Sequence, residues 1–237
     1  MPVIQRILYF STQFPNPRSP GMGIFSLRRV QALQQAGCQV RVISPLLMNP
    51  PPGLLCKPAQ ASKWFRLQSE VPQKMEYQGV PVAYPRWFCP PKKVFGWRMS
   101  GAMFGQVRKT VLDLDESFHP DVIISSWLPD AVAAVKLANI LKIPILSIAD
   151  GTDVNVWTKE YPGWKSARDI LNEKVSTLIF VSEALRRTGA SLGLHGRNNA
   201  VLLNAVDIHL FALSFIEREK KPFTILSIGR FVPMKGF

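Results

Sequence analysis

Residues 6–45 read RILYFSTQFPNPRSPGMGIFSLRRVQALQQAGCQVRVISP, and their apolar pattern indicates the fold class. Residues 6–10 form a short apolar run of the kind that makes a buried strand. Apolar residues then recur at helical spacing over 24–33, and Gly37 follows as a cap of that helix. A second apolar run covers 39–45. Strand, helix and strand in this order predict a βαβ unit with parallel strands.

The loop between the first strand and the helix is rich in Pro, Ser and Gly. Gly21 and Gly23 would let the helix N-terminus come close to a ligand, and its free N–H groups favour phosphate. Ser26 stands where a dinucleotide-binding loop has its third glycine, and no acidic residue follows the second strand to hold a ribose. The sequence therefore disfavours a nicotinamide cofactor.

Strands and helices continue to alternate along the chain. We expect strands at 79–84, 122–126, 144–149 and from 177 onward, and helices at 96–114, 129–141 and after Ser182, which is expected to cap its helix. Such alternation predicts an α/β fold, a Rossmann-like parallel sheet with helices on both faces. Ligands of such sheets bind in the loops at the carboxyl ends of the strands.

Composition places the chain among ordinary globular proteins. It has 237 residues, 47% of them hydrophobic, and a mean hydropathy of +0.07. The most apolar long window, 131–149, is interrupted by two lysines and a proline, so no membrane-spanning segment is predicted. The three cysteines, Cys38, Cys56 and Cys89, lie far apart, without the spacing of a zinc site or redox pair. We expect a reducing, cytoplasmic setting.

The positive charge is concentrated in the first half of the chain. Residues 1–112 contain 15 Lys and Arg against 2 Glu, a net charge of +13, whereas the remaining residues contain 14 basic and 14 acidic side chains. Residues 63–66 and 85–99 interleave aromatic rings with these cations. This pattern suits an anionic membrane surface, stacked bases of single-stranded nucleic acid, or rings packed under loops with exposed charges. A non-catalytic module that binds a membrane or nucleic acid is one alternative function.

The best candidate site follows the predicted strand 144–149. Asp150, Gly151, Thr152 and Asp153 supply two carboxylates, a flexible glycine and a hydroxyl at the ligand-binding edge. A helix cap or an Asx turn would use the same residue types.

A second candidate site lies at the end of the sequence. Residues 223–228 read as a further buried strand that Gly229 ends, and Arg230 and Lys235 follow on either side of a turn at Pro233. Two cations at the carboxyl end of a strand could hold an anion. The alternative is a strand end with two solvated charges.

These motifs, in this order, resemble the retaining glycosyltransferases of family 4. Phe14, Pro15, Gly23 and Phe25 match the family's first loop, and 177–186 and 201–207 match later segments. Gly151, Thr152 and Asp153 align with the family's His-Gly-x-Asp motif, with Asp150 in the place of the histidine. The resemblance implies the first half of a GT-B fold. Residues 1–215 would form the N-terminal domain on the acceptor side, and 216–237 the linker and first strand of a truncated donor-binding domain.

The resemblance also implies an activity, the transfer of a sugar from a nucleotide-sugar donor to a glycan or lipid-linked glycan. Asp150 would be the catalytic residue, and Arg230 and Lys235 would neutralise the leaving diphosphate without a metal, so no metal or other cofactor is expected. The acceptor and sugar would be held by the loop residues Gly21, Gly23, Gly151, Thr152 and Asp153. The enzyme would work in the cytoplasm at the inner face of the membrane, with no nucleic acid partner, and residues 1–237 alone would be inactive.

Overall fold

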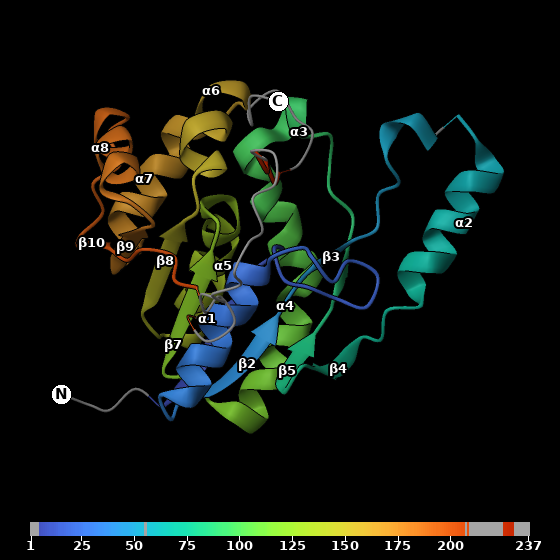
Figure 1. Ribbon diagram of the computed structural model, residues 1–237, viewed down its shortest axis with the longest axis horizontal. Helices are drawn as coiled ribbons and strands as arrows, with labels where there is room; N and C mark the ends of the chain where they lie inside the picture. The colour runs from blue at the N-terminus through green and yellow to red at the C-terminus, as the bar shows by residue number, and fades with distance from the viewer. Residues whose placement is uncertain (1–4, 55, 207, 209–224, 230–237) are drawn as a thin grey trace, which may run out of the picture. The chain divides into compact units, whose positions relative to one another are not determined.

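The computed structural model describes residues 5–54, 56–206, 208 and 225–229 (Figure 1). The chain divides into two compact units, Met1–Asn204 and Ala205–Phe237. Among the described residues, all helices and strands belong to the first unit.

An eight-stranded sheet forms the centre of the first unit, with the strand order β10-β9-β8-β7-β1-β2-β5-β4. Its pairings are parallel except for the antiparallel pair β4–β5 at one edge. The strands are β1 (Arg6–Phe10), β2 (Gln39–Ile43), β4 (Lys74–Tyr77), β5 (Val80–Ala83), β7 (Val122–Ser126), β8 (Ile145–Ala149), β9 (Thr177–Phe180) and β10 (Asn199–Val201). The two-residue strands β3 (Leu46–Leu47) and β6 (Arg86–Trp87) pair separately.

Helices cover both faces of the sheet, which confirms the predicted Rossmann-like fold (Figure 1). They are α1 (Ile24–Gln35), α2 (Pro58–Ser69), α3 (Lys92–Phe95), α4 (Met99–Phe118), α5 (Leu128–Leu141), α6 (Thr158–Glu160), α7 (Trp164–Lys174) and α8 (Glu183–Ser191), with the short turns η1 (Pro52–Leu54) and η2 (Gly96–Arg98) and the π-helix η3 (Asp153–Trp157).

Strand β1 shows why two layers of helices are needed. Its side chains alternate between two buried clusters, because successive residues of a strand point to opposite faces. Leu8 and Phe10 pack into the cluster that includes α4 and α5, whereas Ile7 and Tyr9 pack into the cluster that includes α1. The central strands are therefore apolar on both faces.

Several local predictions are confirmed and others need correction. Ser182 caps α8, because its hydroxyl accepts a hydrogen bond from the Leu185 N–H at 3.1 Å. The helix predicted from Gly96 begins instead at Met99, because Gly96 adopts a positive φ of 48° and the next residue, Trp97, donates its N–H to the Pro162 carbonyl. The elements that were not predicted are helices α2, α3, α6 and α7 and strands β3, β4, β6 and β10.

The strand predicted at 223–228 is described only in part. Residues 223 and 224 lie outside the described residues, and 225–229 have no assigned strand. Ile225, Leu226 and Ile228 are exposed. A strand needs a hydrogen-bonded neighbour, and 225–229 have none within the part of the chain that the structure describes.

Across the part of the chain that the structure describes, no helix is long and apolar enough to cross a membrane.

Candidate active site

Polar side chains meet at the carboxyl edge of the sheet. Strands β1, β7 and β8 are parallel neighbours, so the residues at or just after their ends, Ser11, Ser126 and Asp150, lie at the same edge. The Ser11 hydroxyl donates to the Ser126 carbonyl at 3.3 Å, which joins two of these strand ends. This edge is where ligands of open α/β sheets bind.

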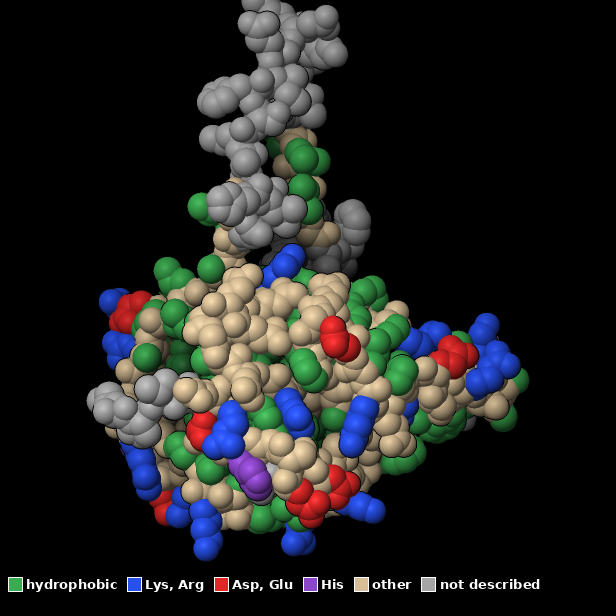
Figure 2. Space-filling view, turned by 90° about the horizontal axis from the view of Figure 1, so that it is seen from below, with side chains coloured by type: hydrophobic (Ala, Val, Ile, Leu, Met, Phe, Trp, Pro, Cys, Tyr) green, Lys and Arg blue, Asp and Glu red, His purple; other side chains and the backbone are tan. Residues whose placement is uncertain are grey.

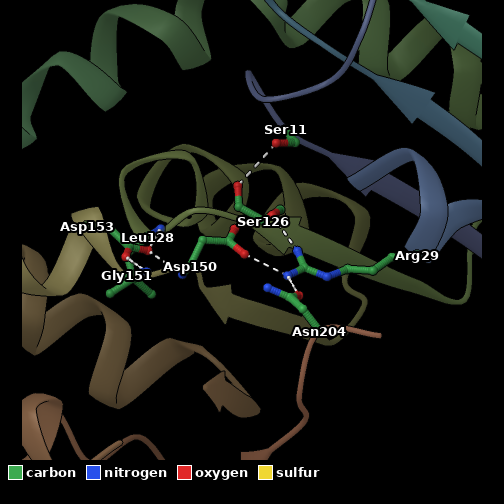
Figure 3. Close-up of polar contacts among 8 residues, drawn as sticks. All are labelled: Ser11, Arg29, Ser126, Leu128, Asp150, Gly151, Asp153 and Asn204. Atoms are coloured by element: carbon green, nitrogen blue, oxygen red, sulfur yellow. Dashed lines mark hydrogen bonds and ion pairs between the residues drawn. The ribbon is translucent and has the colours of Figure 1, made fainter. Parts of the chain in front are cut away.

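Arg29 on α1 ties this edge together (Figure 3). Its Nη2 lies 2.7 Å from the Asp150 Oδ1, and its Nη1 donates to the Ser126 Oγ at 3.0 Å. The Ser126 hydroxyl donates in turn to the Asp150 Oδ2 at 2.6 Å. Arg29 Nη2 also donates to the Asn204 Oδ1 at 2.7 Å. Each oxygen of Asp150 thus accepts one hydrogen bond from a fixed donor.

The Arg29–Asp150 pair is largely withdrawn from water. Their side chains are only 17% and 27% exposed. Burial by itself would lower the pKa of Arg29, but the hydrogen bond and the negative charge of Asp150 outweigh it and raise that pKa above its ordinary value. Arg29 is therefore a permanent cation beside Asp150.

Asp153 organises the loop that carries Asp150. Its carboxylate is fully buried and accepts four backbone N–H groups, those of Leu128, Asp150, Gly151 and Val154, at 2.8–3.1 Å. Burial raises the pKa of Asp153 to about 6, although these N–H donors oppose the shift. Asp153 fixes the positions of the loop backbone.

Asp130, near the start of α5, holds the loop after β1 in place in a similar way. Its carboxyl group is fully buried, and its Oδ2 accepts the Thr12 N–H at 2.6 Å and lies 2.9 Å from the Thr12 hydroxyl. Burial raises the pKa of Asp130 to about 8, against the lowering effect of the Thr12 hydrogen bonds. From the sequence, this residue is expected only at the start of a helix, and its contact with the loop after β1 was not predicted.

A cavity of about 300 Å³ lies next to the cluster of polar side chains formed by Arg29, Ser126 and Asp150. Its lining includes Thr12 and Trp127, which directly follow Ser11 and Ser126 in the chain. Its aromatic lining comes from Trp64, Trp87 and Trp127. Its amide groups come from Gln13, Asn16 and Gln68. The Trp87 indole N–H is buried without a hydrogen-bond partner among the described residues. Aromatic walls with a few polar groups are typical of small-molecule sites.

The backbone of Trp127 is strained at the rim of this cavity. Its φ is +77°, in a region that residues other than glycine rarely adopt. Its N–H donates to the Ile148 carbonyl at 2.9 Å, and its ring meets that of Trp157 edge-on at 4.7 Å between centroids. Strain of this kind gathers at ligand-binding sites, so the fixed ring supports a role for this cavity in binding.

The predicted site residues fall into three groups. Asp150, Gly151 and Thr152 directly follow β8, and Asp153 begins the π-helix η3 next to them. Gly23 caps α1 with a φ of 68°, and a Cβ there would overlap the Gln13 carbonyl, whereas Gly21 is exposed with open space around it. Arg230 and Lys235 lie outside the described residues.

Arg29, Ser126 and Asn204 were missed by the sequence analysis as members of this site. Arg29 could have been found from the sequence, because it is the neighbour of the core-facing Val30 on a helix that starts at the ligand-binding edge. The sequence gives no comparable indication for Asn204, since it lies 175 residues after Arg29 in the chain. Within the described residues, no group of three or more His, Cys, Asp or Glu side chains could hold a metal ion.

Residues 21–210 match the model of Glycosyltransferase Family 4. The chain belongs to this family. Among curated proteins, this family 4 chain is 26% identical over 207 residues to the putative teichuronic acid biosynthesis glycosyltransferase TuaC of Bacillus subtilis (strain 168). The match covers 87% of this chain and 51% of TuaC, so the chain spans about half the length of that relative.

Solved structures share the fold of this family 4 chain. Sucrose-phosphate synthase from Thermosynechococcus elongatus matches with a TM-score of 0.60 at 10% identity, over 87% of this chain and 49% of that one. Anabaena HepE, solved in complex with UDP and glucose, matches with a TM-score of 0.50 at 15% identity, over 89% of this chain and 47% of that one. The chain has the architecture of the first half of a GT-B glycosyltransferase, as predicted.

Proposed function

We propose that the protein carrying this chain transfers a sugar, with retention of configuration, from a nucleotide-sugar to a glycan or lipid-linked glycan. The observation that carries the proposal is the Asp150 carboxylate, held by Arg29 and Ser126 at the ligand-binding edge of a family 4 domain. This chain would supply the acceptor side of the site.

Asp150 is suited to stabilise a cationic sugar. The transition state of glycosyl transfer resembles an oxocarbenium ion, and a preorganised carboxylate nearby lowers its free energy. The two fixed hydrogen bonds of Asp150 leave further lone pairs on its oxygens, because a carboxylate can accept about four. Arg29 would act as a positioning residue that keeps Asp150 oriented.

The cavity beside the cluster is suited to a sugar acceptor. The side chains of Trp64, Trp87 and Trp127 line the cavity and offer apolar surface to a sugar ring. The amides of Gln13 and Gln68 could bind hydroxyl groups of the sugar. Its volume of about 300 Å³ lies at the lower end of the range for ligand pockets.

The donor would be bound largely by the part of the protein that begins near residue 216. Arg230 and Lys235 would neutralise the leaving diphosphate without a metal, since two cations can offset its developing charge. HepE was solved in complex with UDP and glucose, which supports a nucleotide-sugar as the donor class here. The reaction would take place in the cytoplasm, at the inner face of the membrane.

A donor screen tests this function. The complete protein is incubated with a panel of nucleotide-sugars and lipid-linked acceptors, and release of nucleoside diphosphate is measured. We expect acceptor-dependent release from one class of donor without added metal, and none from residues 1–237 alone. Absence of release with every donor by a folded complete protein would instead favour the non-catalytic binding module.

A further inference from the structure

Helix α2 stands out from the rest of the first unit (right in Figure 1). No residue of α2 is buried. Figure 2 shows blue Lys and Arg side chains beside green hydrophobic ones on this projection. Core packing does not explain the exposed apolar side chains of such a helix. Exposed apolar side chains of this kind mark surfaces that bind a partner or a membrane.

Exposed apolar side chains lie on α2, on α3 and on the segment just before α3. The rings of Phe65 on α2 and Phe88, just before α3, lie 6.4 Å apart between centroids. On α3 every side chain is exposed, and Val94 is the most exposed of its apolar residues at 70%. The apolar part of the surface consists of Phe65, Phe88, Val94 and Phe95.

Cations border these apolar side chains. The exposed basic residues of the two helices are Lys63, Arg66, Lys92 and Lys93. The nearest acidic residue in sequence, Glu70, is paired with Arg18 at 3.4 Å. The four apolar and four basic side chains together are called the α2–α3 surface. Its charge is complementary to an anion, and its exposed rings need an apolar contact as well.

We propose that the α2–α3 surface docks on an anionic lipid bilayer. Phenylalanine side chains enter the interface between headgroups and acyl chains, while Lys and Arg stay among the anionic headgroups. Each cation near such a surface strengthens partitioning by about fivefold, so four of them and four apolar side chains suffice for reversible binding.

The position of this surface gives the docking a role, which rests on the proposed function. Trp64 and Gln68 of α2 and Lys92 of α3 line the cavity proposed for the acceptor. The Trp64 indole N–H donates to the carbonyl of Met48, which directly follows the lining residue Leu47, so α2 is held beside the cavity. A bilayer bound by the two helices would present a lipid-linked acceptor beside this cavity.

Vesicle co-sedimentation of the full chain tests the docking, without any nucleotide-sugar. Vesicles of equal parts phosphatidylglycerol and phosphatidylcholine should bind the chain, and vesicles of phosphatidylcholine alone should not. Lys92→Gln/Lys93→Gln should weaken binding by at least about tenfold and reduce its salt dependence. Phe88→Ser/Phe95→Ser should weaken binding while the salt dependence stays unchanged.

The matched control removes two exposed lysines from other helices, Lys109→Gln on α4 and Lys165→Gln on α7. Equal weakening by the control pair, or equal binding to neutral vesicles, would overturn the proposal. Tighter binding to a single-stranded oligonucleotide, lost in the Lys92/Lys93 variant, would assign the surface to nucleic acid and also overturn it. If the complete protein binds the vesicles but shows no transferase activity, the docking proposal stands and the proposed function is wrong.

Discussion

At the scale of single residues, the site depends on one ion pair between distant segments. Arg29 comes from the first helix and Asp150 from the loop after β8, and each fixes the orientation of the other. Ser126 completes the arrangement by bonding to both. Because the guanidinium stays charged at all relevant pH values, the Asp150 carboxylate always has a cation beside it.

Replacement of Arg29 should lower the stability of the protein as well as its activity. Arg29→Gln removes the charge and leaves the partly buried Asp150 with fewer donors, so we expect the free energy of unfolding to fall by about 1–2 kcal/mol. Urea unfolding measures it. The control Arg168→Gln breaks an ion pair whose Asp169 is 58% exposed, and it should change stability by less than about 0.5 kcal/mol. Equal effects of the two variants would contradict the role given to Arg29.

Burial of Asp130 predicts a pH dependence of stability. Its pKa rises from an ordinary value of 3.8 to about 8 in the folded chain. Between these values the folded chain holds a proton that the unfolded chain releases, so the free energy of unfolding should fall as pH rises from about 4 to about 8. Urea unfolding across this range measures the slope, and Asp130→Asn should flatten it. An unchanged slope in the variant would contradict the assignment.

At the scale of elements, strands were easier to predict than short helices. The bounds of β1 and β7 agree with their apolar runs, since strands buried on both faces need continuous apolar sequence. Helix α2 was missed because it buries no residue and so lacks a core-facing signal. The start of α4 was misplaced because the turn at Gly96 depends on a contact with Pro162, far away in the sequence.

The loop between β1 and α1 offers a matched pair of glycine replacements. Gly23→Ala would place a Cβ against the Gln13 backbone at a positive φ, so we expect a loss of at least about 2 kcal/mol in the free energy of unfolding. Gly21→Ala meets open space and should change it by less than about 1 kcal/mol. Thermal unfolding of both variants checks this. Similar melting temperatures would mean that the loop does not hold the conformation described.

At the scale of the whole molecule, the sequence predicted the six inner strands of the sheet and the loop that carries Asp150. Alternating strands and helices were enough for both, because parallel strands bring their carboxyl ends to one edge. The hydrogen bonds that join Arg29, Ser126, Asp150 and Asn204 could not be predicted, since they link residues 24 to 175 positions apart in the chain. The roles of Arg230 and Lys235 remain predictions, outside the described residues.

The central claim is that Asp150 takes part in sugar transfer, and steady-state kinetics of the Asp150→Asn variant of the complete protein test it most directly. We expect kcat to fall about 100-fold with the donor KM changed less than about threefold, because the carboxylate acts mainly on the transition state. Asp169→Asn, an exposed carboxylate on α7, should leave both unchanged. If folded Asp150→Asn keeps the kcat of the unmodified protein, Asp150 has no catalytic role and the account of the site is wrong.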